Sequence, residues 1–178
     1  MTNAELAMLS LVAERPRHGY EIEQVIEERG MREWTEVGFS SIYYLLKKLE
    51  REALVEGRLE QGQRGPARRV YALTPEGTRQ LRKGVLEALS NPRPCNPSIL
   101  LGLACLPVVS TAEAILALRR YASALRQHGD RLQQKQTNQQ PLPYFVDAVF
   151  DHGLARLEAE LVWVEAFIKR LEEHDGQA

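Results

Sequence analysis

Within its first ninety residues the chain switches from helical to strand periodicity and back again, and this switch restricts the fold more than any other feature. Apolar residues recur at helical spacing up to about residue 51. Residues 54–59 and 69–73 then read as two short strands, joined by a loop with two glycines and a proline. Thr74 and Pro75 restart a helix, as its N-cap and its first residue. The order of three helices, a hairpin and a fourth helix predicts a winged helix-turn-helix.

Three helices are predicted before the hairpin. The first spans Asn3–Glu14, with Asn3 as its N-cap. The second follows the break at Arg15–Gly19 and stops at Gly30. The third begins at Ser40 or Ser41. Its buried stripe is predicted to consist of Ile42, Leu45, Leu46 and Leu49.

The other faces of this third helix carry hydroxyl groups, cations and two aromatic rings. The net charge of the chain is −1, yet the segment from Lys47 to Arg69 has seven basic and four acidic residues. A locally basic surface on a neutral chain is expected where one face meets phosphates. We expect the third helix to enter the major groove of duplex DNA. The loop of the hairpin, called the wing, would reach the flanking backbone or minor groove.

Roles at the DNA are assigned by position along these elements. The N-terminal half of the third helix would lie nearest the base edges, and its later cations would neutralise phosphates. Because neighbouring strand residues face opposite sides, Arg68 and Arg69 cannot both point at DNA, and Arg68 is favoured. The predicted DNA-binding residues are Ser40, Ser41, Tyr43, Tyr44, Lys47, Lys48, Arg51, Arg64 and Arg68.

Plainer interpretations stay open for the same residues. The cations of the third helix are interleaved with Glu50 and Glu52, so they could form helical ion pairs on a solvated face. Tyr43 could pack over the edge of the domain. A winged helix can also bind protein instead of DNA. An apolar or acidic third helix and a neutral wing would then be expected, and this chain has neither.

Three prolines between residues 92 and 97 exclude a continuous helix and mark a linker. The chain is therefore predicted to have a DNA-binding domain at residues 1–90, a linker at 91–97 and a helical domain at 98–178. The helical domain should hold two long helices, at about 112–136 and 143–173. Little chain remains to cover them, so they must bury their apolar stripes against each other or a second subunit. This predicts a homodimer, whose two-fold symmetry suits a palindromic operator.

Two sets of residues are singled out in the long helices. The predicted dimerisation residues are Leu118, Tyr121, Leu125, Val149, Phe150, Leu157, Leu161, Val164 and Ile168. A pocket between subunits could stack a planar or phenolic effector, and its predicted lining is Tyr121, Phe150, Trp163 and Phe167. An ordinary dimer core is the alternative for these aromatic side chains.

Other classes of function find little support. No apolar run approaches the ~20 residues that span a bilayer, and the N-terminus lacks a secretion signal, so a cytoplasmic protein is expected. Cys95 and Cys105 form no CxxC motif, although a thiol or metal sensor stays an alternative. Asp147 and Asp151, with His152 beside them, are better interpreted as a solvated helix face than as a weak metal site. The sequence shows no catalytic arrangement and no phosphate-binding loop, so no enzyme, cofactor or metal site is predicted.

Several motifs, taken in order, resemble the PadR family of transcriptional regulators. The stretch His18-Gly19-Tyr20-Glu21-Ile22 resembles the start of that family's second helix. Ser41-Ile42-Tyr43 and Leu46-Lys47-Lys48-Leu49-Glu50 resemble its recognition helix. Gly65-Pro66, Arg69, Tyr71 and Leu73-Thr74-Pro75-Glu76-Gly77 resemble its wing, second strand and following helix. The resemblance covers residues 4–86, whereas residues 98–174 resemble the longer C-terminal region of one subgroup in length and helix pattern only.

This resemblance implies a dimer that represses neighbouring genes and is often released by a small molecule. Tyr44 stands where proline is common in the family, so operator preference cannot be borrowed from relatives. Ala53 stands where glycine usually ends the recognition helix. The residues and the resemblance together predict a homodimeric, sequence-specific DNA-binding repressor, relieved by a small-molecule effector.

Overall fold

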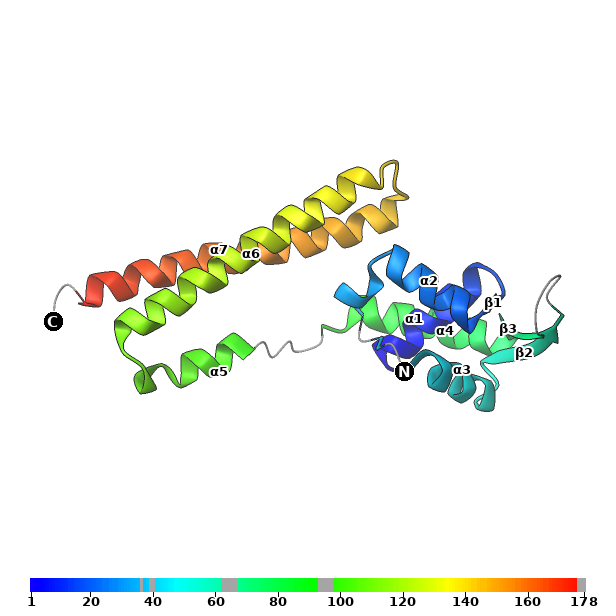
Figure 1. Ribbon diagram of the computed structural model, residues 1–178. Helices are drawn as coiled ribbons and strands as arrows, with labels where there is room; N and C mark the ends of the chain where they lie inside the picture. The colour runs from blue at the N-terminus through cyan, green and yellow to red at the C-terminus, as the bar shows by residue number, and fades with distance from the viewer. Residues whose placement is uncertain (36, 39–40, 62–66, 93–97, 176–178) are drawn as a thin grey trace. The chain divides into compact units, whose positions relative to one another are not determined.

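The computed structural model describes residues 1–35, 37–38, 41–61, 67–92 and 98–175 of the chain (Figure 1). It divides into two compact units, Met1–Pro94 and Cys95–Ala178. The chain is mainly helical with one small antiparallel sheet. This confirms the predicted fold class, a winged helix-turn-helix followed by long C-terminal helices. None of the described helices is long and apolar enough to cross a membrane.

The first unit contains its elements in the predicted order. Its helices are α1 (Asn3–Glu14), α2 (Gly19–Glu28), α3 (Ser41–Arg51) and α4 (Pro75–Ser90), with a short 3-10 helix, η1, at Met31–Glu33. The hairpin consists of β2 (Val55–Glu60) and β3 (Arg68–Leu73). Its antiparallel register pairs Val55 with Leu73 at one end and Glu60 with Arg68 at the other.

The sequence does not predict the third strand, β1 (Arg17–His18). It pairs with β3, so the order of the sheet is β1-β3-β2. Two residues are too few to show the alternation by which a strand is recognised. The consequence for function is positional, because β1 brings His18 to the wing strand and to the start of α2 at once.

Local capping signals set where the helices begin. Thr2, one residue before the predicted Asn3, caps α1 through a capping box with Glu5. Thr74 caps α4 as predicted, because its hydroxyl accepts the N–H of Gly77 at 2.9 Å and Pro75 follows at the first helical position.

Helix α3 turns its predicted apolar stripe into the core of the first unit. Ile42, Leu46 and Leu49 are completely buried, and Leu45 nearly so. They join apolar side chains of α1 and α2 in one continuous cluster. Full burial of such a side chain contributes roughly 1.5–3 kcal/mol each. The stripe therefore fixes the rotation of α3 about its axis and leaves the opposite face open.

In the second unit two long helices, α6 (Thr111–Asn138) and α7 (Tyr144–Asp175), lie side by side (Figure 1). A short helix, α5 (Ser98–Ala104), and a 3-10 turn, η2 (Leu106–Val108), precede them. The ion pairs Arg119–Glu172 and Arg126–Glu165 show that α6 and α7 run antiparallel. The buried seam between the two helices consists of Leu118, Ala122, Val164 and Ile168.

Candidate nucleic-acid interface

The open face of α3 presents the side chains that the sequence singled out. Tyr43 is 54% exposed and Tyr44 62% exposed, and Lys47 and Arg51 are exposed as well. Ser41 is half-buried, and its hydroxyl donates to the carbonyl of Gly38 at 2.7 Å. Ser40 and Arg64, two further predicted contacts, lie outside the described residues.

Tyr44, Lys47 and Arg51 share one side of this face. With Glu50 they line a shallow hollow of about 430 Å³. In the part of the chain that the structure describes, neither Lys47 nor Arg51 forms an ion pair with a carboxylate. Two cations with free donors beside an exposed phenol ring can meet an anionic surface without first breaking an internal contact.

Lys48 occupies a different environment from its neighbour. Its ammonium donates to the carboxylate of Glu5, which is buried in α1, and lies 3.8 Å from Glu52. Burial raises the pKa of Glu5, but hydrogen bonds from Lys48 and Thr2 outweigh burial and hold that pKa below its usual value. Lys48 therefore ties α3 to α1, which counts against its predicted role as a phosphate contact.

The wing strand is anchored to α3 through Glu50. Arg69 donates from Nη2 to Glu50 Oε1 at 2.6 Å, and the same oxygen accepts the N–H of Gly57 at 3.0 Å. A Cβ at Gly57 would lie 2.5 Å from Arg69 Nε and 2.6 Å from Glu50 Oε1, so glycine gives the ion pair its space. The sequence offered Glu50 only as a partner in ion pairs along the third helix and did not predict its bond to the wing strand, although a lone glycine inside a strand signals a close approach of this kind.

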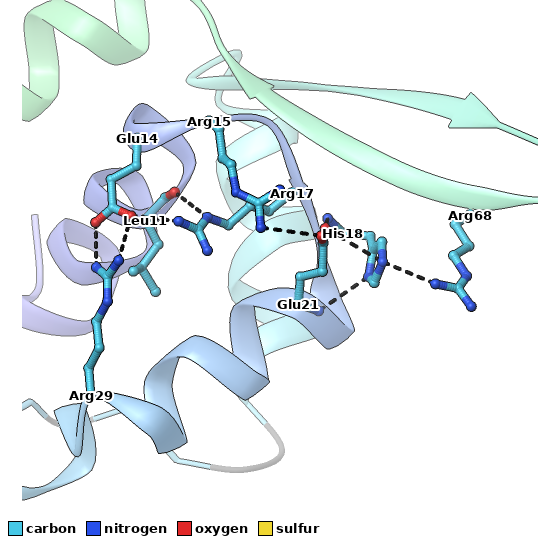
Figure 2. Close-up of polar contacts among 8 residues, drawn as sticks. All are labelled: Leu11, Glu14, Arg15, Arg17, His18, Glu21, Arg29 and Arg68. Carbon is cyan, nitrogen blue, oxygen red and sulfur yellow. Dashed lines mark hydrogen bonds and ion pairs between the residues drawn. The ribbon is translucent and has the colours of Figure 1, made fainter. Parts of the chain in front are cut away.

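Arg68, the next residue along β3, points elsewhere. Its Nη1 lies 3.2 Å from Nε2 of His18, as Figure 2 shows, and no carboxylate of the described chain pairs with it. Both arginines are exposed, but the alternation along β3 directs only Arg69 to Glu50. The assignment of Arg68 to DNA stays a prediction.

A second, larger hollow of about 460 Å³ lies between the start of α2, α3 and β3. Its lining includes His18, Gly19, Tyr20, Tyr43, Arg68 and Arg69. The ring of Tyr43 packs over Gly19, where an added Cβ would come within 2.6 Å of Tyr43 Cε1. Tyr43 therefore both packs at the domain edge and stays exposed.

A buried arginine fixes the start of α2 relative to α1 (Figure 2). Arg17 is 4% exposed, and it donates to the carbonyl of Leu11 at 3.0 Å and to Glu14 at 2.5 Å. Glu14 also accepts two hydrogen bonds from Arg29 of the α2 C-cap, and those bonds hold the pKa of Glu14 below its usual value. The backbone around His18 and Gly19 is therefore held by side chains on both sides.

In the second unit the predicted effector residues are only partly brought together. Trp163 and Phe167 stack with ring centroids 5.2 Å apart, and the guanidinium carbon of Arg170 lies 5.2 Å from the Phe167 centroid. Tyr121 donates to Glu160 at 2.5 Å, and burial together with this bond raises its pKa to about 12. Phe150 is buried further toward the start of α7.

The predicted dimerisation residues divide by burial. Leu118, Val164 and Ile168 form the seam within one chain, and Tyr121, Leu125 and Leu161 are half-buried against it. Their own chain covers these side chains, so they offer little surface to a second copy. Phe150 is likewise buried, Leu157 is half-buried, and Val149 is exposed. Large exposed apolar side chains outside the predicted dimerisation set include Leu116, Tyr144, Phe145 and Val162.

The arrangement of the described side chains does not support the alternatives of a metal sensor or a thiol sensor. Asp147 and Asp151 both accept hydrogen bonds from the buried amide of Gln136, at 2.9 and 3.2 Å. The described residues contain no cluster of three or more histidine, cysteine or carboxylate side chains arranged for a metal ion. Cys105 is an exposed free thiol, and Cys95 lies outside the described residues.

Comparison with known proteins finds one family whose model matches most of the first unit. Residues 8–83 match the family described as transcriptional regulator PadR-like. No curated protein matches the chain.

Solved structures share the fold over nearly the whole chain. Bacillus subtilis PadR in complex with operator DNA is 20% identical, with a TM-score of 0.78 over 94% of this chain and 98% of that one. The same protein in complex with p-coumaric acid is also 20% identical, with a TM-score of 0.76 over the same shares. The PadR-like transcriptional regulator BC1756 from Bacillus cereus is 15% identical, with a TM-score of 0.71 over 96% of this chain and 99% of that one.

Proposed function

Because residues 8–83 match the PadR-like transcriptional regulator family, we propose that the protein is a sequence-specific DNA-binding repressor that acts as a homodimer in the cytoplasm. One observation carries the proposal. The face of α3 opposite the core is open and presents Tyr43, Tyr44, Lys47 and Arg51, and the two cations have no carboxylate partner among the described residues.

The dimensions of α3 suit the major groove. An α-helix with its side chains is about 10–12 Å across, and the major groove of B-DNA is about 12 Å wide. Tyr44, near the start of α3, is the candidate for base contacts, for example with a thymine methyl group. Lys47 and Arg51 follow one and two turns later, where they would neutralise phosphates. Arg68 on the wing strand would meet the flanking DNA backbone. Lys48 and Arg69 instead form ion pairs that connect α3 to α1 and to β3.

The homodimer is supported by the surface of α6 and α7. Phe145, Val149 and Trp163 are 61%, 42% and 41% exposed, and their spacing places them on one face of α7. Exposed apolar side chains gathered in this way mark protein interaction sites. A second copy covering them would also supply the two recognition helices that a palindromic operator needs.

A small aromatic effector is part of the proposal. Bacillus subtilis PadR has been solved with p-coumaric acid, and its fold matches this chain. The stacked Trp163 and Phe167, with the Arg170 guanidinium over Phe167, form an aromatic and cationic surface that suits a planar anion. Tyr121 and Phe150 remain predicted lining residues.

The test is a binding titration of the full chain against its own upstream intergenic DNA and an unrelated duplex of equal length, at several salt concentrations. We expect tight binding to the upstream duplex alone, weakening steeply as salt rises because counterions are released from the phosphates. Negligible binding to both duplexes would contradict the proposal and favour a winged helix that binds protein.

Within that titration, two variants separate base from phosphate contacts. Lys47→Gln should weaken binding to both duplexes and reduce the salt slope by about 1. Tyr44→Ala should change the preference between sequences and leave the slope in place. If both variants bind as the wild type does, α3 is not the reading helix.

A further inference from the structure

The hollow between the start of α2, α3 and β3 contains two nitrogen donors that face each other with no acceptor between them. His18 Nε2 and Arg68 Nη1 are 3.2 Å apart. Which of the two could accept a hydrogen bond depends on the proton of the imidazole ring, and the capping of α2 decides where that proton is.

His18 is the N-cap of α2 and uses its other ring nitrogen for the cap. Nδ1 accepts the N–H of Glu21 at 3.2 Å, so Nδ1 carries no proton. A neutral imidazole ring with a bare Nδ1 carries its proton on Nε2. Nε2 is therefore a donor toward Arg68, and a guanidinium is a donor only. The contact between them cannot be a hydrogen bond, and the two groups share a need for an acceptor.

The nearby carboxylates do not supply that acceptor to Arg68. Glu50 is already bound by Arg69. Glu21 accepts the backbone N–H of His18 at 3.1 Å and lies 3.5 Å from Nε2, at the limit of a weak contact, and it is absent from the lining of the hollow. Arg68 thus remains an unneutralised cation at the mouth of a hollow of about 460 Å³.

The rest of the lining suits an oxyanion that enters from solvent. Tyr20 and Tyr43 are each more than half exposed and bring phenol groups to the same hollow. The hollow lies beside the open face of α3 and beside the wing strand, so a duplex docked on α3 would run its backbone past this point.

We propose that this hollow seats one phosphate of the DNA backbone, with His18 Nε2–H and the Arg68 guanidinium as paired donors to one phosphate oxygen. The proposal rests on the proposed function and names a contact that the third helix does not make. It assigns His18 two tasks at once, because the ring caps α2 through Nδ1 and binds phosphate through Nε2. This phosphate site recognises the charge and position of the DNA backbone, so its contribution to binding does not depend on the base sequence.

The experiment replaces single phosphates of the upstream duplex by neutral methylphosphonates and measures the affinity of the full chain for each duplex. The wild type should lose about tenfold at the seat position, the effect of one charge-assisted hydrogen-bonded contact. Arg68→Gln and His18→Asn should each bind the unmodified duplex about tenfold more weakly, and the same methylphosphonate should cost them nothing more. His18→Asn keeps an oxygen that can cap α2, so the helix start is retained.

Lys47→Gln is the matched control, because it removes one positive charge at a position outside the hollow. It should remain sensitive to the methylphosphonate at the seat and lose its response only at the phosphate that Lys47 itself contacts. If Arg68→Gln responds to every methylphosphonate as the wild type does, the inference is overturned while the proposed function stands. If the wild type binds no duplex at all, the proposed function falls and the inference falls with it.

Discussion

The two units of the chain differ in how completely they bury their apolar side chains. In the first, sixteen described hydrophobic residues form one buried cluster, drawn mostly from α1, α2, α3 and the sheet. In the second, the buried cluster between α6 and α7 has only four residues, while several large apolar side chains stay exposed on the same helices. The first unit covers its own core, whereas the second leaves apolar surface that a second copy can cover.

This difference explains where recognition can be placed. A self-sufficient core fixes α3 and lets its other face be polar and cationic without loss of stability. A two-helix seam cannot do so alone, because two amphipathic helices need a third layer to bury their remaining apolar faces. We therefore propose DNA contact for the first unit and self-association for the second.

The largest effect is expected from a charge on the exposed apolar face of α7, which tests whether this face forms the dimer interface. Val149→Glu should weaken the dimer more than a hundredfold, because burying an unpaired charge costs several kcal/mol. Sedimentation equilibrium would show the shift to monomer. Ala148→Glu is the matched control, since it adds the same charge at the adjacent exposed position on another face. A dimer that withstands Val149→Glu would remove Val149 from the interface.

A core substitution in the first unit tests whether the stability of that unit depends on its own core. Leu46→Ala should lower the free energy of unfolding of that unit by about 3 kcal/mol, because Leu46 is completely buried and a cavity remains. Urea denaturation followed by circular dichroism measures the loss. Oligomeric state at temperatures below the transition should be unaffected. A fall in dimer affinity of equal size would show that the two units are energetically one.

A substitution at Gly19 tests whether the open face of α3 can be altered while the core of the first unit stays intact. Gly19→Ala should displace the Tyr43 ring, reduce affinity for the upstream duplex about tenfold and leave the unfolding transition nearly unchanged. Adding Tyr43→Ala to this variant should cost nothing further. Gly38→Ala is the control, since among the described residues its Cβ would meet only Ser41 Oγ, at 3.7 Å. Equal losses in the two glycine variants would contradict the packing of Tyr43 on Gly19.

The smallest expected effect concerns the end of the recognition helix. Ala53 has φ 55°, in the left-handed region where a side chain is strained, so Ala53→Gly should stabilise the first unit by about 0.5–1 kcal/mol. Ala88→Gly, at an exposed position inside α4, should destabilise by about the same amount. Thermal unfolding would show the opposite signs. A destabilising Ala53→Gly would mean that the strain at this position is negligible.

The sequence predicts local features well because they depend on neighbours in the chain. The stripe of α3, the two wing strands and the Thr74 cap follow from spacing and from short-range hydrogen bonds. Strand β1 has only two residues, so it carries no period and is recognised only by its pairing with β3. The loop of the wing, with Arg64, lies outside the described residues and its role stays a prediction.

Charge partners are the part of the candidate site that could not be predicted. Lys47 and Lys48 are adjacent and look alike in the sequence, yet Lys48 meets Glu5 of α1, 43 positions away in the chain. Arg68 and Arg69 differ in the same way, because Glu50 reaches only Arg69. A sequence shows where the cations are, whereas the fold decides which of them is already neutralised. This difference separates the cations that form ion pairs within the first unit from the candidate phosphate contacts.

Native mass spectrometry of the full chain with its upstream duplex tests the central claim most directly, because it counts protein chains and DNA in one complex. We expect two protein chains per duplex. Val149→Glu should leave free DNA and single chains, and Lys47→Gln combined with Arg51→Gln should leave free DNA and dimer. One chain per duplex, or a protein dimer that ignores the duplex, would contradict the division of labour between the two units.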